Sequence, residues 1–214
     1  MNKTQLLSEL KSEGFPNHII KAFSKVKREN FIPKELKPYA YLNEPLPLAI
    51  GSTISQPYTI AFMLDLLELD NLSNSKQESE SKSKPIGDTN IKILEIGSGS
   101  GYVLALINEI LPSSKIYGIE RIKSIATKSK QTLKQDKNIK VIHSDGSKGL
   151  SNQALFDRIL ISAAYDKTPT HLYKQLKDNG VLVVPVKNSI YQIKKDKDKI
   201  KKKEFPGFVF VPIK

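Results

Sequence analysis

Three carboxylates stand at the ends of predicted strands, and they are the side chains most suited to binding a ligand. Glu95 closes an apolar run that begins at Ile91, Glu120 closes a second run, and Asp145 follows a third, shorter one. Because the carboxyl ends of parallel strands meet at one edge of a sheet, we expect the three acids to lie close together. Glu120 could accept hydrogen bonds from ribose hydroxyls, and Asp145 could accept one from an exocyclic amine such as that of adenine.

Three glycines at alternate positions, Gly97, Gly99 and Gly101, follow Glu95 and precede a predicted helix. They would let the backbone approach a bound molecule closely. A dinucleotide loop would need its third glycine where this chain has Tyr102, and the Gly-Lys-Ser/Thr ending of a phosphate loop is absent. Acids without a phosphate loop suit a neutral or cationic nucleoside, and S-adenosylmethionine is the obvious example. A cap or turn role would explain each acid equally well when it is taken alone.

A second unusual stretch, Gly51 to Pro57, is rich in small and hydroxylic residues and lies just before a predicted helix. Ser55 therefore stands at a helix N-terminus, where free N–H groups and the helix dipole favour an anion. The alternative is that Ser55 or Thr59 is only an N-cap. The local sequence leaves both interpretations open.

Composition excludes several other chemistries. The 214 residues include no cysteine, and the three histidines are scattered, so we expect neither a cysteine nucleophile nor a metal site. There is no signal-peptide core and no apolar run near the roughly 20 residues of a membrane span. The expectation is a soluble, cytoplasmic protein with no membrane contact.

The net charge of +12 raises the question of a nucleic-acid partner. Residues 187–204 hold eight lysines against three acids, the other lysines are spread along the chain, and only three arginines are present. Aromatic residues are not interleaved with the lysines as in single-strand binders. We therefore interpret the charge as a solvated surface and expect no nucleic-acid partner.

The elements that must position these residues suggest one domain over residues 1–214. Residues 1–50 form a helical and proline-rich segment wrapped on the domain, with helices expected at 3–12 and 17–29. A further helix is expected over 59–69. Residues 71–90 are polar and serine-rich, which is typical of a flexible insertion.

From residue 91 onward, strands and helices alternate, which predicts an α/β fold with a doubly wound, mostly parallel sheet. The Lys/Asp run near 196–198 is interpreted as the solvated tip of a hairpin, and residues 208–213 as a closing antiparallel strand. The expected strands are 91–96, 115–120, 140–142, 156–164, 181–186, 191–195 and 199–205; the expected helices are 103–111, 121–134 and 168–177.

Several motifs resemble, in the same order, those of the protein-L-isoaspartate (D-aspartate) O-methyltransferase family. The resemblance covers residues 17–70 and 91–214. The glycine loop is shared by many methyltransferases, so the segment Thr53-Ile54-Ser55-Gln56-Pro57 is the more specific match. The matching stretches include R-E-N-F-I-P, A-Y-L-N-E-P-L-P-L, G-S-T-I-S-Q-P, L-E-I-G-S-G-S-G-Y, F-D-R-I-L-I-S-A-A and the terminal F-V-P-I.

The resemblance implies a Rossmann-like class I methyltransferase that transfers the methyl group of S-adenosylmethionine to the α-carboxylate of isoaspartyl residues in damaged proteins. The ester then forms a succinimide, whose hydrolysis restores some normal aspartate. Isoaspartyl proteins and peptides would be the partners of a monomeric enzyme. Ser55 would position the acceptor carboxylate. Substrate contacts would come from Thr53, Ile54, Gln56, Val211 and Pro212, and cofactor contacts from Glu95, Gly97, Ser98, Gly99, Gly101, Glu120, Asp145 and Gly146.

The chain departs from the family pattern at a few places. Lys27 replaces the usual proline before Arg28, Tyr165 and Asp166 follow the Ala-Ala pair after the fourth strand, and Ser144 precedes Asp145-Gly146 where a glycine is more usual. Two rival interpretations remain. One is a methyltransferase of the same fold acting on RNA or a small molecule, although the stretch ending at Tyr165 lacks the Asn/Asp-Pro-Pro grip for a planar amine. The other is a non-catalytic binding module.

Overall fold

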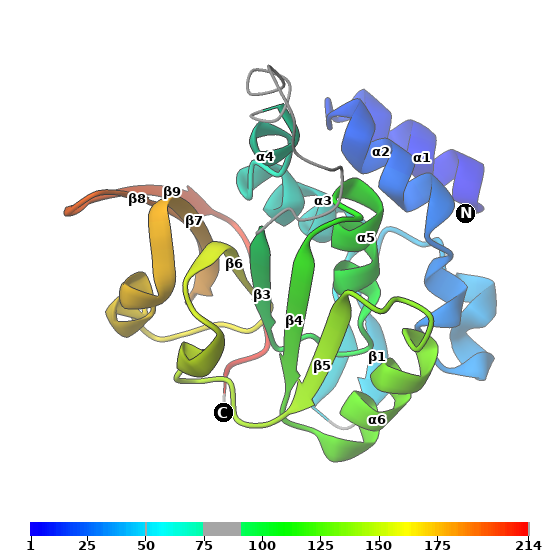
Figure 1. Cartoon of the computed structure of the whole chain (residues 1–214). Helices are drawn as coiled ribbons and strands as arrows, with labels where there is room; N and C mark the ends of the chain where they lie inside the picture. The colour runs from blue at the N-terminus through cyan, green and yellow to red at the C-terminus, as the bar shows by residue number, and fades with distance from the viewer. Residues whose placement is uncertain (50, 75–90, 214) are drawn as a thin grey trace, which may run out of the picture.

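A seven-stranded sheet forms the centre of the chain in the computed structural model, which describes residues 1–49, 51–74 and 91–213. The strand order is β5-β4-β3-β6-β7-β8-β9; pairing is parallel from β5 to β7 and antiparallel from β7 to β9 (Figure 1). The strands are β3 (Lys92–Ile96), β4 (Lys115–Glu120), β5 (Ile139–His143), β6 (Phe156–Ile161), β7 (Leu176–Val186), β8 (Ser189–Asp196) and β9 (Lys199–Pro206). A separate two-stranded sheet joins β1 (Leu46–Ala49) to β2 (Ser52–Ile54).

The central strands are buried on both faces, as their nearly continuous apolar sequences require. Neighbouring residues of β3 illustrate this, because Ile93 belongs to one hydrophobic core and Leu94 to the other. The first core includes the N-terminal helices and Tyr102, whereas the second includes Leu172. Two apolar layers therefore hold the sheet in place.

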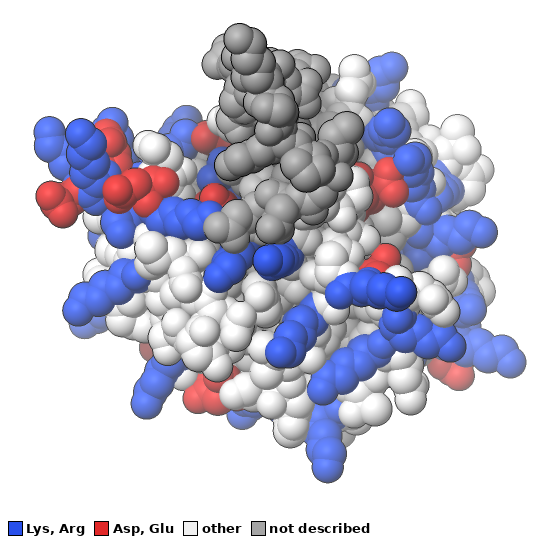
Figure 2. All heavy atoms as spheres, viewed as in Figure 1, with Lys and Arg blue, Asp and Glu red and all other residues white. Residues whose placement is uncertain are grey.

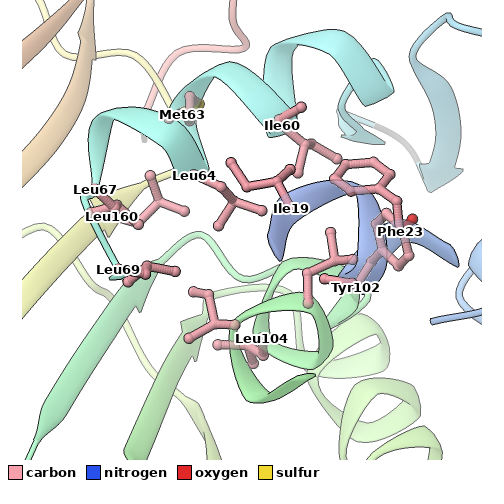
Figure 3. Close-up of a cluster of buried hydrophobic side chains, with 14 of the residues drawn as sticks. Ile19, Phe23, Ile60, Met63, Leu64, Leu67, Leu69, Tyr102, Leu104 and Leu160 are labelled. Atoms are coloured by element: carbon pink, nitrogen blue, oxygen red, sulfur yellow. The ribbon is translucent and has the colours of Figure 1, made fainter. Parts of the chain in front are cut away.

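Helices from distant parts of the sequence build the larger core. Figure 3 shows Ile19 and Phe23 meeting Ile60 and Leu64, with Tyr102 beside them; all are buried. The rings of Phe23 and Tyr102 pack edge to face with centroids 6.0 Å apart. The α-helices are α1 (Lys3–Ser12), α2 (Asn17–Lys25), α3 (Pro57–Leu66), α4 (Asp70–Asn74), α5 (Tyr102–Ile110) and α6 (Lys123–Thr132); the 3-10 helices are η1 (Arg28–Asn30), η2 (Lys34–Tyr39), η3 (Ser151–Gln153) and η4 (Thr170–Gln175).

The order of the strands places a topological switch between β3 and β6. The chain runs β3-α5-β4-α6-β5 toward one edge, and then returns to place β6 on the other side of β3. Ligands of open α/β sheets bind outside the carboxyl ends of the strands at such a point. The predicted fold class is confirmed: the sheet is mostly parallel, its last two strands are antiparallel, and helices precede it.

The lysine-rich segment forms the predicted hairpin. Strands β8 and β9 pair up to Asp196 and Lys199, which leaves Lys197 and Asp198 as the exposed turn. Figure 2 shows basic side chains scattered over the viewed face, with lysines and acids together at the free end of this hairpin.

Two predicted helices are wrong in extent or type. The helix expected over 17–29 ends at Lys25, because Val26 is extended (φ −80°, ψ 116°) and Arg28 turns inward. The helix expected over 168–177 is only the 3-10 helix η4, because Leu176 already pairs with Phe156 at the start of β7. In both cases, long-range contacts outweigh local helix propensity.

The closing strand was also predicted wrongly. Gly207 (φ +96°) ends β9, and the segment that follows does not extend the sheet antiparallel to a neighbour. Instead, Pro212 forms an isolated parallel bridge with Ala164. Residues 208–213 therefore lie near the carboxyl end of β6, beside the predicted site.

The predicted insertion at 71–90 falls mostly outside the described residues; residues 71–74 belong to α4. In the described part of the chain, no helix is both long and apolar enough to cross a lipid bilayer.

Candidate functional site

Three neighbouring pockets lie along the carboxyl ends of the central strands. The strand-end pocket is lined by Gly97, Gly99, Glu120, Asp145 and Ser162, among others. The serine pocket contains Ser55, and the connecting cavity contains Glu95. Thr53 and Ser162 line all three. Molecules bound in the strand-end pocket and in the serine pocket would therefore meet beside these two hydroxyls.

The N–H groups of the glycine loop between β3 and α5 are bonded mainly to the end of β4. Gly97 and Ser98 donate to the carbonyl of Ile119 at 2.8 and 3.0 Å, and Gly101 donates to that of Ser98 at 2.9 Å. Gly97, Gly99 and Gly101 all have positive φ, as their residue type allows. A loop bonded in this way presents no row of free N–H groups to a phosphate, in agreement with the absence of a phosphate-loop sequence.

Glu120 is fixed at the end of β4 with its carboxylate in the strand-end pocket. It is 6% exposed; Oε2 accepts the N–H of Gly99 at 2.9 Å, and Oε1 accepts that of Ile122 at 2.7 Å. Each carboxylate oxygen has a second lone pair for a ligand. The arrangement suits a pair of hydroxyls such as those of a ribose.

Asp145 reaches the same pocket from the loop after β5. Its oxygens accept the N–H and the hydroxyl of Ser147 at 2.8 and 3.0 Å, and these bonds lower the pKa of the Asp145 carboxyl. Gly146 is packed so closely that a Cβ would lie 2.7 Å from a methyl group of Ile96. The structure therefore brings Glu120, Asp145 and Gly146 together, with Asp145 as an ionised acceptor.

Glu95 differs from the other two acids. It is 1% exposed and lines the connecting cavity instead of the strand-end pocket. Ser162 donates to Oε1 at 2.8 Å, and Oε2 has no hydrogen-bond partner among the described residues. Burial raises the pKa of Glu95 to about 8, the Ser162 hydrogen bond opposes the rise, and the nearby charge of Glu120 adds to it. Near neutral pH, Glu95 is thus mainly an uncharged acid in the connecting cavity.

Two other predicted cofactor residues do not line the strand-end pocket. Ser98 is buried and lines only the connecting cavity; a Cβ at Gly118 would lie 2.9 Å from its hydroxyl. Gly101 lines none of the three pockets. A Cβ at Gly101 would lie 2.5 Å from the Ser129 hydroxyl and 2.6 Å from Leu133. The third glycine therefore permits the glycine loop to lie close against the end of α6.

The serine pocket has a volume of about 430 Å³ and is formed by distant segments. Thr53 comes from β2, Ser55 and Gln56 come from the turn between β2 and α3, and Val211 and Pro212 come from the terminal segment. Among the described residues, Ser55 Oγ has no hydrogen-bond partner. The predicted substrate residues thus converge, except that the buried side chain of Ile54 lines the connecting cavity.

Hydrogen bonds to Ala164 hold the terminal segment against the pocket. The N–H of Ala164 donates to the carbonyl of Val211 at 2.8 Å, and the N–H of Ile213 donates to the carbonyl of Ala164 at 2.8 Å. Residues just beyond β6 therefore hold the last residues of the chain in place.

Sequence reasoning missed Ser162 and Arg28. Ser162 was noticed only as part of an Ala-Ala stretch, although it lies where the three pockets meet. Arg28 is fully buried and donates to the carbonyl of Ser55 at 3.1 Å. The available signal was composition: in a chain with 31 lysines and only three arginines, an arginine indicates a need for a planar group with several donors. In the described part of the chain, no group of three or more acidic, histidine or cysteine side chains could hold a metal ion.

Comparison with known proteins connects this geometry to one family. Residues 1–76 and 87–214 match the family model described as protein-L-isoaspartate (D-aspartate) O-methyltransferase. A protein-L-isoaspartate O-methyltransferase of Petrotoga mobilis is 39% identical over 214 residues, covering 96% of this chain and 91% of the relative. One of Ignicoccus hospitalis is 35% identical over 221 residues, covering 99% and 96%.

Solved structures agree with this result. A beta-aspartate methyltransferase of Plasmodium falciparum, crystallised with S-adenosyl-L-homocysteine, superposes with a TM-score of 0.81 at 27% identity; the match covers 100% of this chain and 99% of that one. A further protein-L-isoaspartate O-methyltransferase structure, at 23% identity and a TM-score of 0.80, supports the fold and covers 99% of this chain and 65% of that one.

Proposed function

Because this chain belongs to the protein-L-isoaspartate (D-aspartate) O-methyltransferase family, we propose that it methylates the α-carboxylate of L-isoaspartyl residues in damaged proteins. S-adenosylmethionine supplies the methyl group, and the ester begins repair through a succinimide. The main structural support for the proposal is that an acid-lined pocket and a hydroxyl-lined pocket share Thr53 and Ser162.

The strand-end pocket is our candidate for the donor site. The free lone pairs of Glu120 would accept the ribose hydroxyls, and Asp145 would accept an exocyclic amine of the base. Gly97 and Gly99 let the loop lie close to the ligand without a Cβ in the way. When bound, the cofactor supplies a sulfonium methyl group that is open to attack by a nucleophile.

The serine pocket is our candidate for the acceptor site. A carboxylate is ionised at neutral pH and needs no general base, and none of the described residues lining the three pockets is a histidine. The work of the protein is then to align the acceptor and exclude water. The unpartnered hydroxyl of Ser55 would donate to the carboxylate and position it, and Thr53 stands where acceptor and donor meet.

The surroundings of the site suggest how the substrate backbone is held. Val211 and Pro212 are exposed and line the serine pocket together with Gln56 and Thr59. We propose that an extended chain lies between them, with Ile54 supporting the floor from below. Our proposal also includes a single domain that acts as a monomer in the cytoplasm on isoaspartyl proteins and peptides.

A paired peptide assay tests the function. Two peptides of the same sequence, one with an isoaspartyl and one with a normal aspartyl residue, are incubated with enzyme and labelled S-adenosylmethionine. We expect label only in the isoaspartyl peptide, because only its α-carboxylate can enter the serine pocket beside the donor. Equal labelling of both peptides, or of neither while cofactor binds, would contradict the proposal.

A further inference from the structure

Arg28 connects the N-terminal segment to the serine pocket. Its side chain is fully buried, and its two terminal nitrogens donate to four backbone carbonyls. Nη1 bonds to Ala40 and Leu42 at 3.0 and 3.1 Å, and Nη2 bonds to Glu44 and Ser55, both at 3.1 Å. No carboxylate takes part in these bonds.

Among the described residues, no carboxylate forms an ion pair with Arg28, and a buried cation without a counter-ion is costly, so its presence calls for an explanation. Desolvation lowers the pKa of Arg28 to about 10, and the group remains charged at neutral pH. The bonds to residues 40–44 alone would only stabilise the fold of the proline-rich segment. The fourth bond leaves that segment and reaches Ser55, 27 residues further along the chain.

The bond to Ser55 fixes the orientation of one peptide plane. In a trans peptide, the N–H points opposite to the carbonyl, so the N–H of Gln56 faces away from Arg28. Among the described residues, this N–H has no acceptor, whereas that of Tyr58 is taken by Asn43 Oδ1 at 2.9 Å. Ser55 and Gln56 both line the serine pocket, and Arg28 does not.

We propose that Arg28 is a positioning residue for the acceptor carboxylate: it holds the Ser55 carbonyl from behind and thereby presents the N–H of Gln56 to the serine pocket, where this N–H and the Ser55 hydroxyl bind the carboxylate. The inference rests on the proposed function and adds a backbone donor to it. A lysine could not replace the planar fork that spans four carbonyls. The charge of Arg28 also favours an anion nearby in a pocket whose lining contains no charged side chain.

Arg158 provides a matched control. It is 4% exposed and also donates to backbone carbonyls, including Asp157 at 2.9 Å and Glu68 at 3.0 Å, but it lines none of the three pockets. Arg28→Lys and Arg158→Lys should both lower the melting temperature. Only Arg28→Lys should raise KM for the isoaspartyl peptide, by at least about tenfold, because a charge-assisted hydrogen-bond arrangement is lost. The dissociation constant for S-adenosyl-L-homocysteine should stay within about twofold in both variants.

The same assay distinguishes a failure of the proposed function from a failure of the positioning role of Arg28. If the wild type labels no isoaspartyl peptide, the proposed function fails. If it does, and Arg28→Lys leaves KM unchanged or Arg158→Lys raises it equally, the positioning role is overturned.

A measurement on the wild type covers the case in which Arg28→Lys does not fold. With ¹⁵N-glutamine labelling, the Gln56 amide proton, assigned by its loss in Gln56→Asn, should move downfield when the isoaspartyl peptide is added with S-adenosyl-L-homocysteine. The aspartyl twin should not move it. An unmoved Gln56 signal during isoaspartyl peptide binding would overturn the inference.

Discussion

The strand-end pocket and the serine pocket are built in different ways. The strand-end pocket draws mainly on consecutive β-α units, from Gly97 to Gly146, and the N–H groups of its glycine loop are bonded mainly to the end of β4. The serine pocket combines Pro45, the turn around Ser55, Ser162 and residues 209–212. Thr53 and residues 211–212 line both pockets, so the hydrogen bonds at Ala164 support both of them. Of the two, only the serine pocket is lined by Ser55, whose carbonyl is held by Arg28. Donor binding and acceptor binding should therefore be separable by mutation.

The largest separation is expected from Ser55→Ala. Loss of the donor to the acceptor carboxylate should lower kcat/KM for the isoaspartyl peptide by about 10²-fold. Cofactor affinity should be nearly unchanged, because Ser55 does not line the strand-end pocket. Steady-state kinetics and calorimetric titration with S-adenosyl-L-homocysteine measure the two quantities. A collapse of cofactor binding would show that the two pockets are not independent.

Glu120→Gln tests the strand-end pocket as the donor site. An amide loses the charge and one of the two acceptor oxygens that hold the N–H groups of Gly99 and Ile122. Cofactor affinity should fall by roughly ten- to thirtyfold, whereas kcat at saturating cofactor should change little. Calorimetry and initial rates at high cofactor concentration give both values. A lower kcat with unchanged affinity would reverse the assignment of the strand-end pocket.

Glu95 lines the connecting cavity. Its protonation should make the free energy of unfolding of the free enzyme depend on pH. The folded carboxyl keeps its proton up to about pH 8, whereas an unperturbed glutamate releases it near 4.5. Between these values, the folded state binds more protons, so the free energy of unfolding should fall as pH rises, by at most about 1.4 kcal/mol per pH unit, and level off above pH 8.

The control is Glu95→Gln, which cannot titrate. Urea denaturation at pH 5, 6, 7 and 8 should give a flatter dependence for this variant than for the wild type. Parallel curves for the two proteins would mean that Glu95 is ionised in the folded state throughout this range.

The smallest expected effect is a difference in stability between alanine substitutions at two glycines of the same loop, Gly97 and Gly101. Gly97→Ala should cost about 1 kcal/mol of stability, because φ is +78° but a Cβ would meet no atom closer than 3.7 Å. Gly101→Ala should cost about 1 kcal/mol more, since its Cβ would also overlap Ser129 and Leu133. Urea denaturation without cofactor measures both. Equal costs would contradict a packing role for Gly101.

The sequence allowed much of the donor side to be anticipated. Glu120 and Asp145 follow apolar runs at β-α spacing, and parallel topology alone brings such positions to one edge. It could not show that Glu95 lines the connecting cavity, because this depends on the register between β3 and β4. Glu95 pairs with Gly118, which places Glu120 two residues closer to the carboxyl edge of the sheet.

The acceptor side was harder to predict from the sequence. The position of Ser55 before a predicted helix left an anion site and an N-cap both open, and only the family motif indicated its role toward the acceptor. The role of Arg28 depends on carbonyls from residues 40 to 55 that no local pattern reveals. Likewise, the alternation in residues 208–213 resembles a strand, but Gly207 redirects the chain to Ala164. In each case, tertiary hydrogen bonds decided the outcome.

Strand β9 has a consequence for how the molecule meets other chains. It is an edge of the central sheet, and an edge strand leaves a row of backbone groups that can template pairing with a foreign strand. Four of the five residues from Lys199 to Lys203 are lysines, and all four are exposed. Crowded ammonium groups make such pairing unfavourable. Because the substrates are damaged proteins, these lysines should disfavour co-aggregation with them along this edge.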